Sequence, residues 1–446
     1  RVVRLKDFGG DLLLRDVQQR VLKVLEMAEA LSPKYHVVVA NPPYMGGKGM
    51  NAKLGDYAKK AYPDSKSDLF AMFIERGLNL VRQSGISSMI TIQNWMFLPS
   101  FEKMRLHLLS SSSFQNLIQI GFNTFPELNS KFALGVAFCL SRSKADTVGC
   151  YFNLNDAPHS SNKRTVFLEK RRNGGAFKVR KSEFEKIPGR PICYWVSQDL
   201  KECFSNYRSL GEVAEPRQGL ATTDNDKYCR FWPEVSYFEI GRAISSREEA
   251  RLSEKMWFPF NKGGGFRKWF GNNEDIVNWR DDGREIRADI VQKYPYLNGN
   301  PDFVAKNPNC YFRPGITWGA ISLALSVRWD GPGFIPSNAG MKVFADNEFI
   351  LANLISLLNS KVTPSLVGAM SASLNYDQGL IKRLPVIETL NAPNSDLIKT
   401  SKADWDAYET SWDFTTLPLL APEHRDQTLA GSYARLRAHW QGMTDE

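Results

Sequence analysis

The stretch Asn41-Pro42-Pro43-Tyr44 has the residue types and the order needed to bind a flat ring that carries an amino group. The Asn41 side-chain oxygen and the Pro42 backbone carbonyl are two acceptors that can be aimed at the two N–H bonds of an exocyclic amine. The prolines hold these acceptors at nearly fixed φ angles. Tyr44 offers an aromatic face on which a base can stack, a contact worth about 1–3 kcal/mol.

An exocyclic amine of this kind is a poor nucleophile because its lone pair is delocalised into the ring. Two acceptors pull the nitrogen toward a tetrahedral geometry and stabilise the positive charge that develops during attack. The pattern therefore predicts methyl transfer to a nucleobase amine, and a base in a duplex must be flipped out to reach it. The simpler interpretation is a turn after a strand, but the β-branched run before the motif favours the catalytic one.

The motif follows residues 35–40, a run with Val37-Val38-Val39 at its centre that is typical of a buried parallel strand. In open α/β sheets, ligands bind beyond the carboxyl ends of the strands, which supports a functional role for this position. Strands and helices continue to alternate and predict an α/β sheet with helices on both faces. The expected elements are helices at 67–83 and 101–109 and strands at 86–92, 117–120 and 133–140.

The length of 446 residues fits two or three domains. The α/β pattern covers 1–150, a polar and basic connector follows at 151–205, and a loop-rich mixed domain occupies 206–446. Helices are expected there at 349–358, 395–412 and 427–439. The apolar share of 43% is that of a globular protein and argues against disorder, collagen and coiled coil.

Positive charge is concentrated in the connector. Residues 161–190 contain ten lysines and arginines and three carboxylates, whereas the whole chain has a net charge of +9. A polyanion is the natural partner of such a stretch, because binding releases counterions condensed on its phosphates. A solvated loop of biased composition is an equally good interpretation of the charge alone.

Cysteine and histidine usage argues against a metal site or a disulfide framework. The six cysteines include no C-x-x-C pair, and there are only five histidines. The longest run of apolar residues and glycine, 132–140, has nine residues, far short of the roughly 20 that span a bilayer. We therefore expect a cytoplasmic protein with no metal and no membrane association.

The Asn-Pro-Pro-Tyr motif resembles motif IV of the amino-methyltransferases, which act on adenine N6 or cytosine N4. Together with Met45, Gly46 and the stretch 62–70, it resembles the adenine-specific DNA methyltransferases of BREX phage-defence systems, relatives of the fused type IIG restriction–modification enzymes. The resemblance covers nearly all of the chain. It implies a Rossmann-like class I methyltransferase sheet, S-adenosylmethionine as methyl donor, double-stranded DNA as substrate, and other phage-defence proteins as partners. Motif IV alone leaves cytosine N4 and RNA open.

The resemblance also implies roles for single residues. Asp68 and Phe70 fall in motif V and imply contacts with the cofactor, as does Asp11 in a remnant of motif III. Phe125, in the region of motifs VII–VIII, is expected to face the flipped base from the side opposite the tyrosine. It is equally well interpreted as a core aromatic before a strand, and Phe132 is the alternative candidate.

The second domain resembles a target-recognition domain. Residues 210–226 resemble its start in type I and type IIG systems, and 268–272 and 405–414 resemble the BREX enzymes. We therefore expect an α+β target-recognition domain with C-terminal helices at 206–446. Several cations are candidates for phosphate or guanine contacts, although each one alone is more often an ordinary surface charge. They are Lys170, Arg171, Arg172, Arg217, Lys262, Arg267, Lys268 and Arg328.

One expected feature is missing from the sequence. There is no Gly-rich loop of the Asp-Pro-Ala-Cys-Gly-Ser-Gly type, and the close glycines at 47/49, 263–265 and 331/333 follow no suitable strand. Because the chain also starts at Arg1, we expect a piece of a larger protein that lacks most of the cofactor site. The alternative function is a non-catalytic DNA-recognition or assembly module. A fused restriction nuclease has little support. Its motif would be a Pro-Asp pair followed by Glu-x-Lys, and neither Pro63-Asp64 nor Pro301-Asp302 is followed by a convincing Glu-x-Lys.

Overall fold

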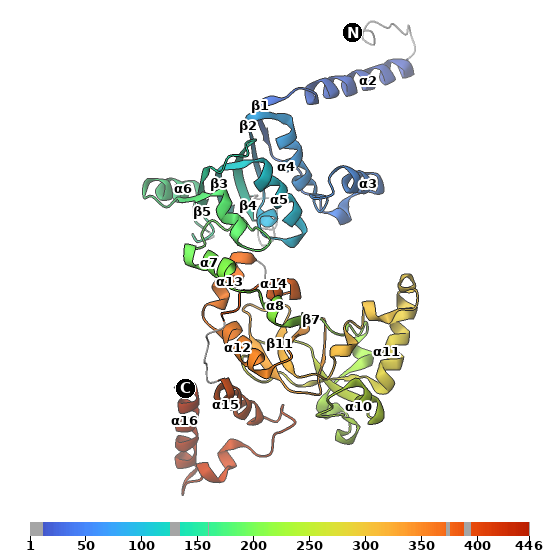
Figure 1. The fold of residues 1–446 in the computed structure, drawn as a ribbon, viewed down its shortest axis with the longest axis vertical. Coiled ribbons are helices and arrows are strands. Elements are labelled where there is room, and N and C mark those ends of the chain that lie inside the picture. Colours follow the sequence, from blue (N-terminus) through green and yellow to red (C-terminus); the bar gives the residue numbers. More distant parts are fainter. Residues whose placement is uncertain (1–11, 125–133, 159, 372–374, 388–393, 446) are drawn as a thin grey trace. The chain divides into compact units, whose positions relative to one another are not determined.

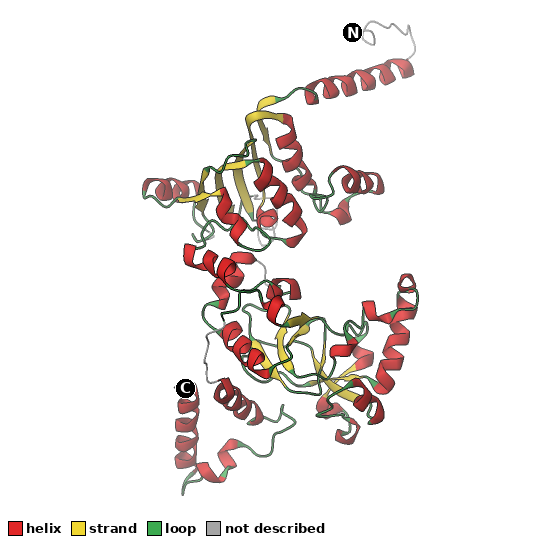
Figure 2. Cartoon of the chain, in the orientation of Figure 1, coloured by secondary structure: helices red, strands yellow, loops and turns green. Residues whose placement is uncertain are grey.

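The structure, a computed structural model, describes residues 12–124, 134–158, 160–371, 375–387 and 394–445 (Figure 1). The chain divides into two compact units, Arg1–Lys201 and Glu202–Glu446, here called unit 1 and unit 2. Strands and helices occur in both units (Figure 2).

Unit 1 is built on a six-stranded sheet in the order β1-β2-β4-β3-β5-β6. β1 is parallel to β2 and β3 is parallel to β5, whereas β4 is antiparallel to both of its neighbours and β6 is antiparallel to β5. The strands are β1 (Tyr35–Ala40), β2 (Val81–Ile92), β3 (Ser113–Gly121), β4 (Gly135–Ser141), β5 (Val148–Asn153) and β6 (Phe177–Arg180). The helices are α2 (Leu12–Leu31), α3 (Ala52–Ala61), α4 (Leu69–Leu80), α5 (Glu102–Ser111) and α6 (Lys163–Arg172), and α7 (Gln198–Asn206) crosses the division between the units.

The expected order of strands and helices in unit 1 is confirmed. α4 begins after Asp68, whose carboxylate accepts from the Phe70 amide, and it buries Phe70, Ile74 and Leu78 at helical spacing. One expectation about β1 is wrong. It is parallel to β2 as predicted, but it is the outermost strand of the described sheet, and Val37 and Val39 are 54% and 75% exposed rather than buried.

The segment interpreted as a connector, 151–205, contributes to the sheet of unit 1. β5 runs beside β3, and β6 pairs with β5 at the far edge. Five of the ten lysines and arginines of 161–190 are exposed, and all five lie on α6 or β6. The composition of the segment thus reflects solvent-facing sides of short elements.

The core of unit 1 is aromatic and encloses a buried cation. Trp95 is stacked on Phe114 at 6.2 Å and meets Phe138 edge-on at 5.2 Å. Arg105 of α5 is 1% exposed. Its guanidinium donates to the carbonyls of Trp95, Leu98 and Gly189 at 2.8–3.1 Å. This one side chain therefore ties the turn after β2 to the end of unit 1.

Unit 2 contains two four-stranded sheets, in the orders β13-β9-β10-β8 and β12-β11-β14-β7. The strands are β7 (Glu215–Arg217), β8 (Cys229–Phe231), β9 (Trp257–Asn261), β10 (Asp275–Asn278), β11 (Gly315–Gly319), β12 (Val327–Asp330), β13 (Ile335–Pro336) and β14 (Gly340–Phe344). The helices are α8 (Leu210–Val213), α9 (Asn225–Tyr228), α10 (Arg247–Leu252), α11 (Arg280–Lys293), α12 (Glu348–Asn359), α13 (Thr363–Met370), α14 (Gln378–Lys382), α15 (Asn394–Asp406) and α16 (Leu429–Asp445). Three helices expected from the sequence correspond to α12, α15 and α16.

The two sheets of unit 2 approach each other through glycine. A Cβ on Gly340 would lie 2.2 Å from the Asn261 carbonyl oxygen, so any other residue would push β14 away from the end of β9. Beside this contact, Lys342 of β14 and Asp330 of β12 form a fully buried ion pair at 2.8 Å. Burial raises the pKa of Asp330 and lowers the pKa of Lys342. Each group depends on the other for compensation of its charge.

Among the described residues, no single helix is long and apolar enough to cross a membrane. The helices α12 and α13, which meet at a bend of 77°, are long and apolar enough only when they are taken together. The described residues contain no group of three or more His, Cys, Asp or Glu side chains that could hold a metal ion.

We predict that Arg105→Ala lowers the free energy of unfolding by about 3–5 kcal/mol. The substitution leaves buried carbonyls without donors and opens a cavity. Urea denaturation followed by circular dichroism measures the effect. Arg164→Ala, at an exposed position of α6, is the control and should change stability by less than about 0.5 kcal/mol. A loss below about 1 kcal/mol for Arg105→Ala would contradict this role.

We predict that Lys342→Met destabilises unit 2 by about 3–5 kcal/mol, because it leaves the carboxyl group of Asp330 buried without its cation. The double variant Lys342→Met/Asp330→Leu should recover most of that loss, since an apolar pair of similar volume needs no compensation. Thermal unfolding of the single and double variants separates the two cases. Equal destabilisation by both would show that shape rather than charge governs this position.

Candidate functional site

Four strands of unit 1 end at the same edge of the sheet. β2 and β3 are each antiparallel to β4 and therefore run in one direction, which β1 and β5 share. The segments that follow all four strands carry amide side chains, namely Asn41 after β1, Gln93 and Asn94 after β2, Asn123 after β3, and Asn155 after β5. This carboxyl edge is where open α/β sheets bind ligands.

The segment after β1 presents some of its groups to solvent and buries others. Asn41 and Pro43 are exposed, Pro42 is buried and Tyr44 is half-buried. The Tyr44 ring meets Phe70 edge-on at 6.0 Å between centroids. Burial, with a smaller contribution from the Asp68 charge, raises the pKa of Tyr44 to about 12. Its ring is therefore a neutral aromatic surface at physiological pH.

Asp68 fixes the loop that follows Tyr44. Its Oδ1 accepts from the Met45 amide at 3.0 Å and from the Phe70 amide at 3.4 Å. Backbone hydrogen bonds from Leu69 to the Met45 carbonyl and from Gly47 to the Ser67 carbonyl join the same two segments. The loop is thus fastened to the start of α4.

Asp68 and Phe70, the residues predicted to contact a cofactor, both lie beside Tyr44. Oδ1 of the Asp68 carboxylate accepts from two backbone amides, and the Phe70 ring is 2% exposed, between Tyr44 and Phe101. These side chains help to position Tyr44, and their contact with a cofactor stays a prediction. Asp11, Phe125 and Phe132 lie outside the described residues.

A buried network of amide side chains supports the ends of β2 and β3. No motif in the sequence predicts it. Gln119 donates to the Gln93 side-chain oxygen at 3.0 Å, and the Tyr194 hydroxyl donates to the Gln119 side-chain oxygen at 2.6 Å. Tyr194 also contacts the Phe152 carbonyl at 3.0 Å. A glutamine inside an apolar strand was the only sequence signal for this network. The network holds the ends of β2 and β3 in place at the carboxyl edge of the sheet.

The predicted DNA-contacting cations of unit 1 lie at the C-terminal end of α6. Arg171 and Arg172 are exposed. Lys170 forms an ion pair with Asp156 at 2.6 Å, with 27% of its side chain exposed. Two of the three predicted cations are therefore presented to solvent on one helix end.

The predicted cations of unit 2 are largely committed to contacts within the unit. Arg217 pairs with Glu215, Lys262 with Asp275 and Arg267 with Asp404, and Lys268 donates to the Asn359 carbonyl. Arg328 is 2% exposed and donates to the Gly263 carbonyl at 2.7 Å. A buried guanidinium cannot reach a phosphate while β12 stays folded, so the structure does not support a DNA contact for Arg328.

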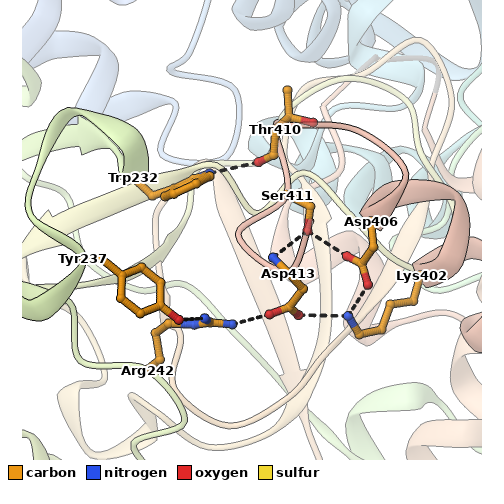
Figure 3. Close-up of polar contacts among 8 residues, drawn as sticks. All are labelled: Trp232, Tyr237, Arg242, Lys402, Asp406, Thr410, Ser411 and Asp413. Atoms are coloured by element: carbon orange, nitrogen blue, oxygen red, sulfur yellow. Dashed lines mark hydrogen bonds and ion pairs between the residues drawn. The ribbon is translucent and has the colours of Figure 1, made fainter. Parts of the chain in front are cut away.

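The stretch 405–414 is fastened to unit 2 by a chain of polar contacts (Figure 3). Arg242 and Lys402 both pair with Asp413, and Lys402 also pairs with Asp406 (Figure 3). Between Asp406 and Asp413, the Thr410 carbonyl accepts from the Trp232 indole N–H at 2.9 Å. These contacts hold the end of α15 and the residues after it to Trp232 and Arg242, which is a structural role.

Comparison with known proteins gives one family match and two close relatives. The family model of the Eco57I restriction-modification methylase matches residues 14–125. The adenine-specific methyltransferase PglX of Lacticaseibacillus casei (strain Zhang) is 34% identical over 444 residues, 96% of this chain and 36% of the relative. The adenine-specific methyltransferase BrxX of Escherichia coli O9:H4 (strain HS) is 34% identical over 433 residues, 95% of this chain and 34% of the relative.

Solved structures resemble the chain more distantly. A nuclease-deletion mutant of the Type ISP restriction-modification enzyme LlaGI, in complex with a DNA substrate mimic, has a TM-score of 0.48 and 11% identity and covers 94% of this chain and 39% of its own. The Type IIL enzyme MmeI, in complex with DNA, has a TM-score of 0.46 and 12% identity, with coverages of 92% and 54%. At these scores the likeness carries no functional argument.

The sequence comparison agrees with the resemblance inferred from the residues after β1. The chain spans about a third of the length of the curated relatives that it matches. The chain is thus homologous, over nearly its whole length, to part of the adenine-specific methyltransferases PglX and BrxX.

Proposed function

We propose that this chain supplies the target-base side and the target-recognition unit of a DNA adenine-N6 methyltransferase of a phage-defence system. The observation that carries the proposal is the Asn-Pro-Pro-Tyr segment at the carboxyl end of β1, with Asn41 exposed and Tyr44 supported from behind by Phe70. The homology to adenine-specific methyltransferases supports it.

In the proposed reaction, the adenine is flipped out of the duplex and stacks on the Tyr44 ring. The Asn41 side-chain oxygen and the Pro42 carbonyl accept hydrogen bonds from the N6 amine. Both interactions strengthen as the nitrogen becomes tetrahedral and positive, so they lower the barrier to direct methyl transfer without a covalent intermediate.

We propose S-adenosylmethionine as the methyl donor, because the relatives are methyltransferases and members of their family use it. Contacts of Asp68 and Phe70 with the donor are part of this proposal and rest on the family resemblance, beside the observed packing of both residues around Tyr44 and its loop. The residues of this chain hold and activate the base.

We propose that double-stranded DNA contacts unit 1 through Arg171 and Arg172, which are exposed at the C-terminal end of α6. In unit 2, Lys262 remains a candidate because its ion pair with Asp275 is loose, at 3.4 Å. A DNA-recognition module without catalysis is the alternative. It would retain DNA on filters but transfer no methyl group.

We predict that Asn41→Ala lowers adenine methylation about 100-fold or more in a methylating protein that contains this chain, because one of the two acceptors on the amine is lost. Transfer of tritium from labelled S-adenosylmethionine to unmethylated genomic DNA measures the rate, and filter retention measures DNA binding. Asn79→Ala, an exposed asparagine of α4, is the matched control and should leave both unchanged. Unaltered methylation by Asn41→Ala would refute the assignment.

We predict that Tyr44→Ala lowers methylation about 10- to 100-fold, whereas Tyr44→Phe stays within a few-fold of the unaltered protein, because stacking needs the ring and not the hydroxyl. The pKa of about 12 means that this hydroxyl does not titrate in the assay range. The same tritium assay compares both variants, with Tyr57→Ala on α3 as the control. Equal losses for the alanine and phenylalanine variants would contradict a stacking role.

A further inference from the structure

Two loops of unit 2 meet at a groove of about 340 Å³. One is the glycine loop, 263–265, and the other is the loop 320–326 between β11 and β12. Polar side chains that line the groove are Gln218, Lys262, Asn338, Asn375 and Asp377, so one lysine and one carboxylate are among them. Backbone lines much of the rest, because glycines 263, 264 and 319 contribute no side chain.

The glycine loop has a fixed shape. Gly263 and Gly264 have φ angles of +96° and +81°, which favour glycine. Buried Arg328 donates to the Gly263 carbonyl, and Asn272 donates to the Gly265 carbonyl at 2.8 Å. Contrary to the sequence interpretation, the loop directly follows a strand, β9, but it leads to β10 rather than a helix, so it is not a dinucleotide-binding loop.

The loop 320–326 is held at both ends and carries apolar side chains between them. The Ala320 amide donates to the Ala339 carbonyl at 2.7 Å, and the Ser326 hydroxyl accepts from the Arg267 amide at 3.4 Å. Ile321 and Leu323 are 80% and 87% exposed. A loop anchored in this way presents its aliphatic side chains to solvent without the freedom to bury them.

A third exposed apolar residue belongs to the other loop. Phe266 follows the glycine loop directly and is 59% exposed, and the amide of the next residue, Arg267, donates to the Ser326 hydroxyl at the end of the loop 320–326. We call Phe266, Ile321 and Leu323 the apolar rim, and Ile321 itself lines the groove. Three apolar side chains on two loops that also line a groove of amides, a lysine and a carboxylate are too small a surface for a stable protein interface, which needs about 800 Å² from each partner.

The combination fits duplex DNA. Apolar wedges of Phe, Leu or Ile enter base steps and unstack them, while Asn, Gln and Lys contact base edges and phosphates in the adjoining groove. A glycine backbone lets the duplex approach closely. We propose that the apolar rim inserts into duplex DNA as a wedge and that Gln218, Lys262 and Asn338 contact the DNA beside it. This inference rests on the proposed function, in which unit 2 engages DNA.

Relaxation of a closed circular plasmid by topoisomerase in the presence of the 446-residue chain tests the wedge, because unstacking a base step unwinds the duplex. The variant is Ile321→Ser/Leu323→Ser, supplemented by Phe266→Ser. The control is Leu252→Ser/Phe238→Ser, which alters two side chains of similar exposure, 68% and 82%, away from the groove. Filter retention of the same plasmid measures affinity, and circular dichroism verifies folding.

We expect the unaltered chain and the control to shift the topoisomer distribution, and the rim variants to lose the shift and bind DNA roughly tenfold more weakly. Retention of DNA without any shift would overturn the wedge and leave the proposed function intact. A shift that persists in the rim variants would overturn the assignment to these side chains. Absence of retention by the unaltered chain would overturn both proposals.

Discussion

The common direction of β1, β2, β3 and β5 is the constraint on which the candidate site depends. β4 lies between β2 and β3 and is antiparallel to both. β2 and β3 therefore run in the same direction. The amide-bearing segments after β1, β2 and β3 consequently meet at one edge. A single strand of reversed direction among these would separate the Asn-Pro-Pro-Tyr segment from the rest of that edge.

Side chains packed around the Tyr44 ring and beside the ends of β2 and β3 support this edge. Phe70 supports the Tyr44 ring, and Asp68 joins the following loop to the start of α4. Gln93 and Gln119 form a hydrogen-bonded pair beneath the edge. An aromatic face can act as a stacking surface only if its position is fixed. The contacts that fix it come from three separate parts of the chain.

Charge has different uses in the two units. In unit 1 the cations at the end of α6 face solvent, whereas most predicted cations of unit 2 are paired or buried. Arg328 and Lys342 serve the interior, where they hold the glycine loop and neutralise Asp330. The strongest case for a ligand surface in unit 2 therefore comes from exposed apolar side chains around a glycine-lined groove rather than from its charge.

Much of unit 1 could be predicted because its signals are local. A β-branched run ended by two prolines marks a strand and the loop after it, and apolar residues at helical spacing mark α4. Three helices of unit 2, α12, α15 and α16, were recognisable for the same reason. Its short strands were not, because three to five residues bounded by glycine and proline carry too little periodicity.

Within the candidate site, the sequence by itself determined the acceptors and the aromatic face, since Asn41, Pro42 and Tyr44 are adjacent in the chain. The order of the sheet, the exposure of β1 and the supporting tasks of Asp68 and Phe70 were decided by tertiary structure. So were the burial of Arg328 and the meeting of the glycine loop with the loop 320–326 at one groove. These features depend on which distant segments pack together. Residue type and spacing do not show which residues far away in the chain become neighbours in space.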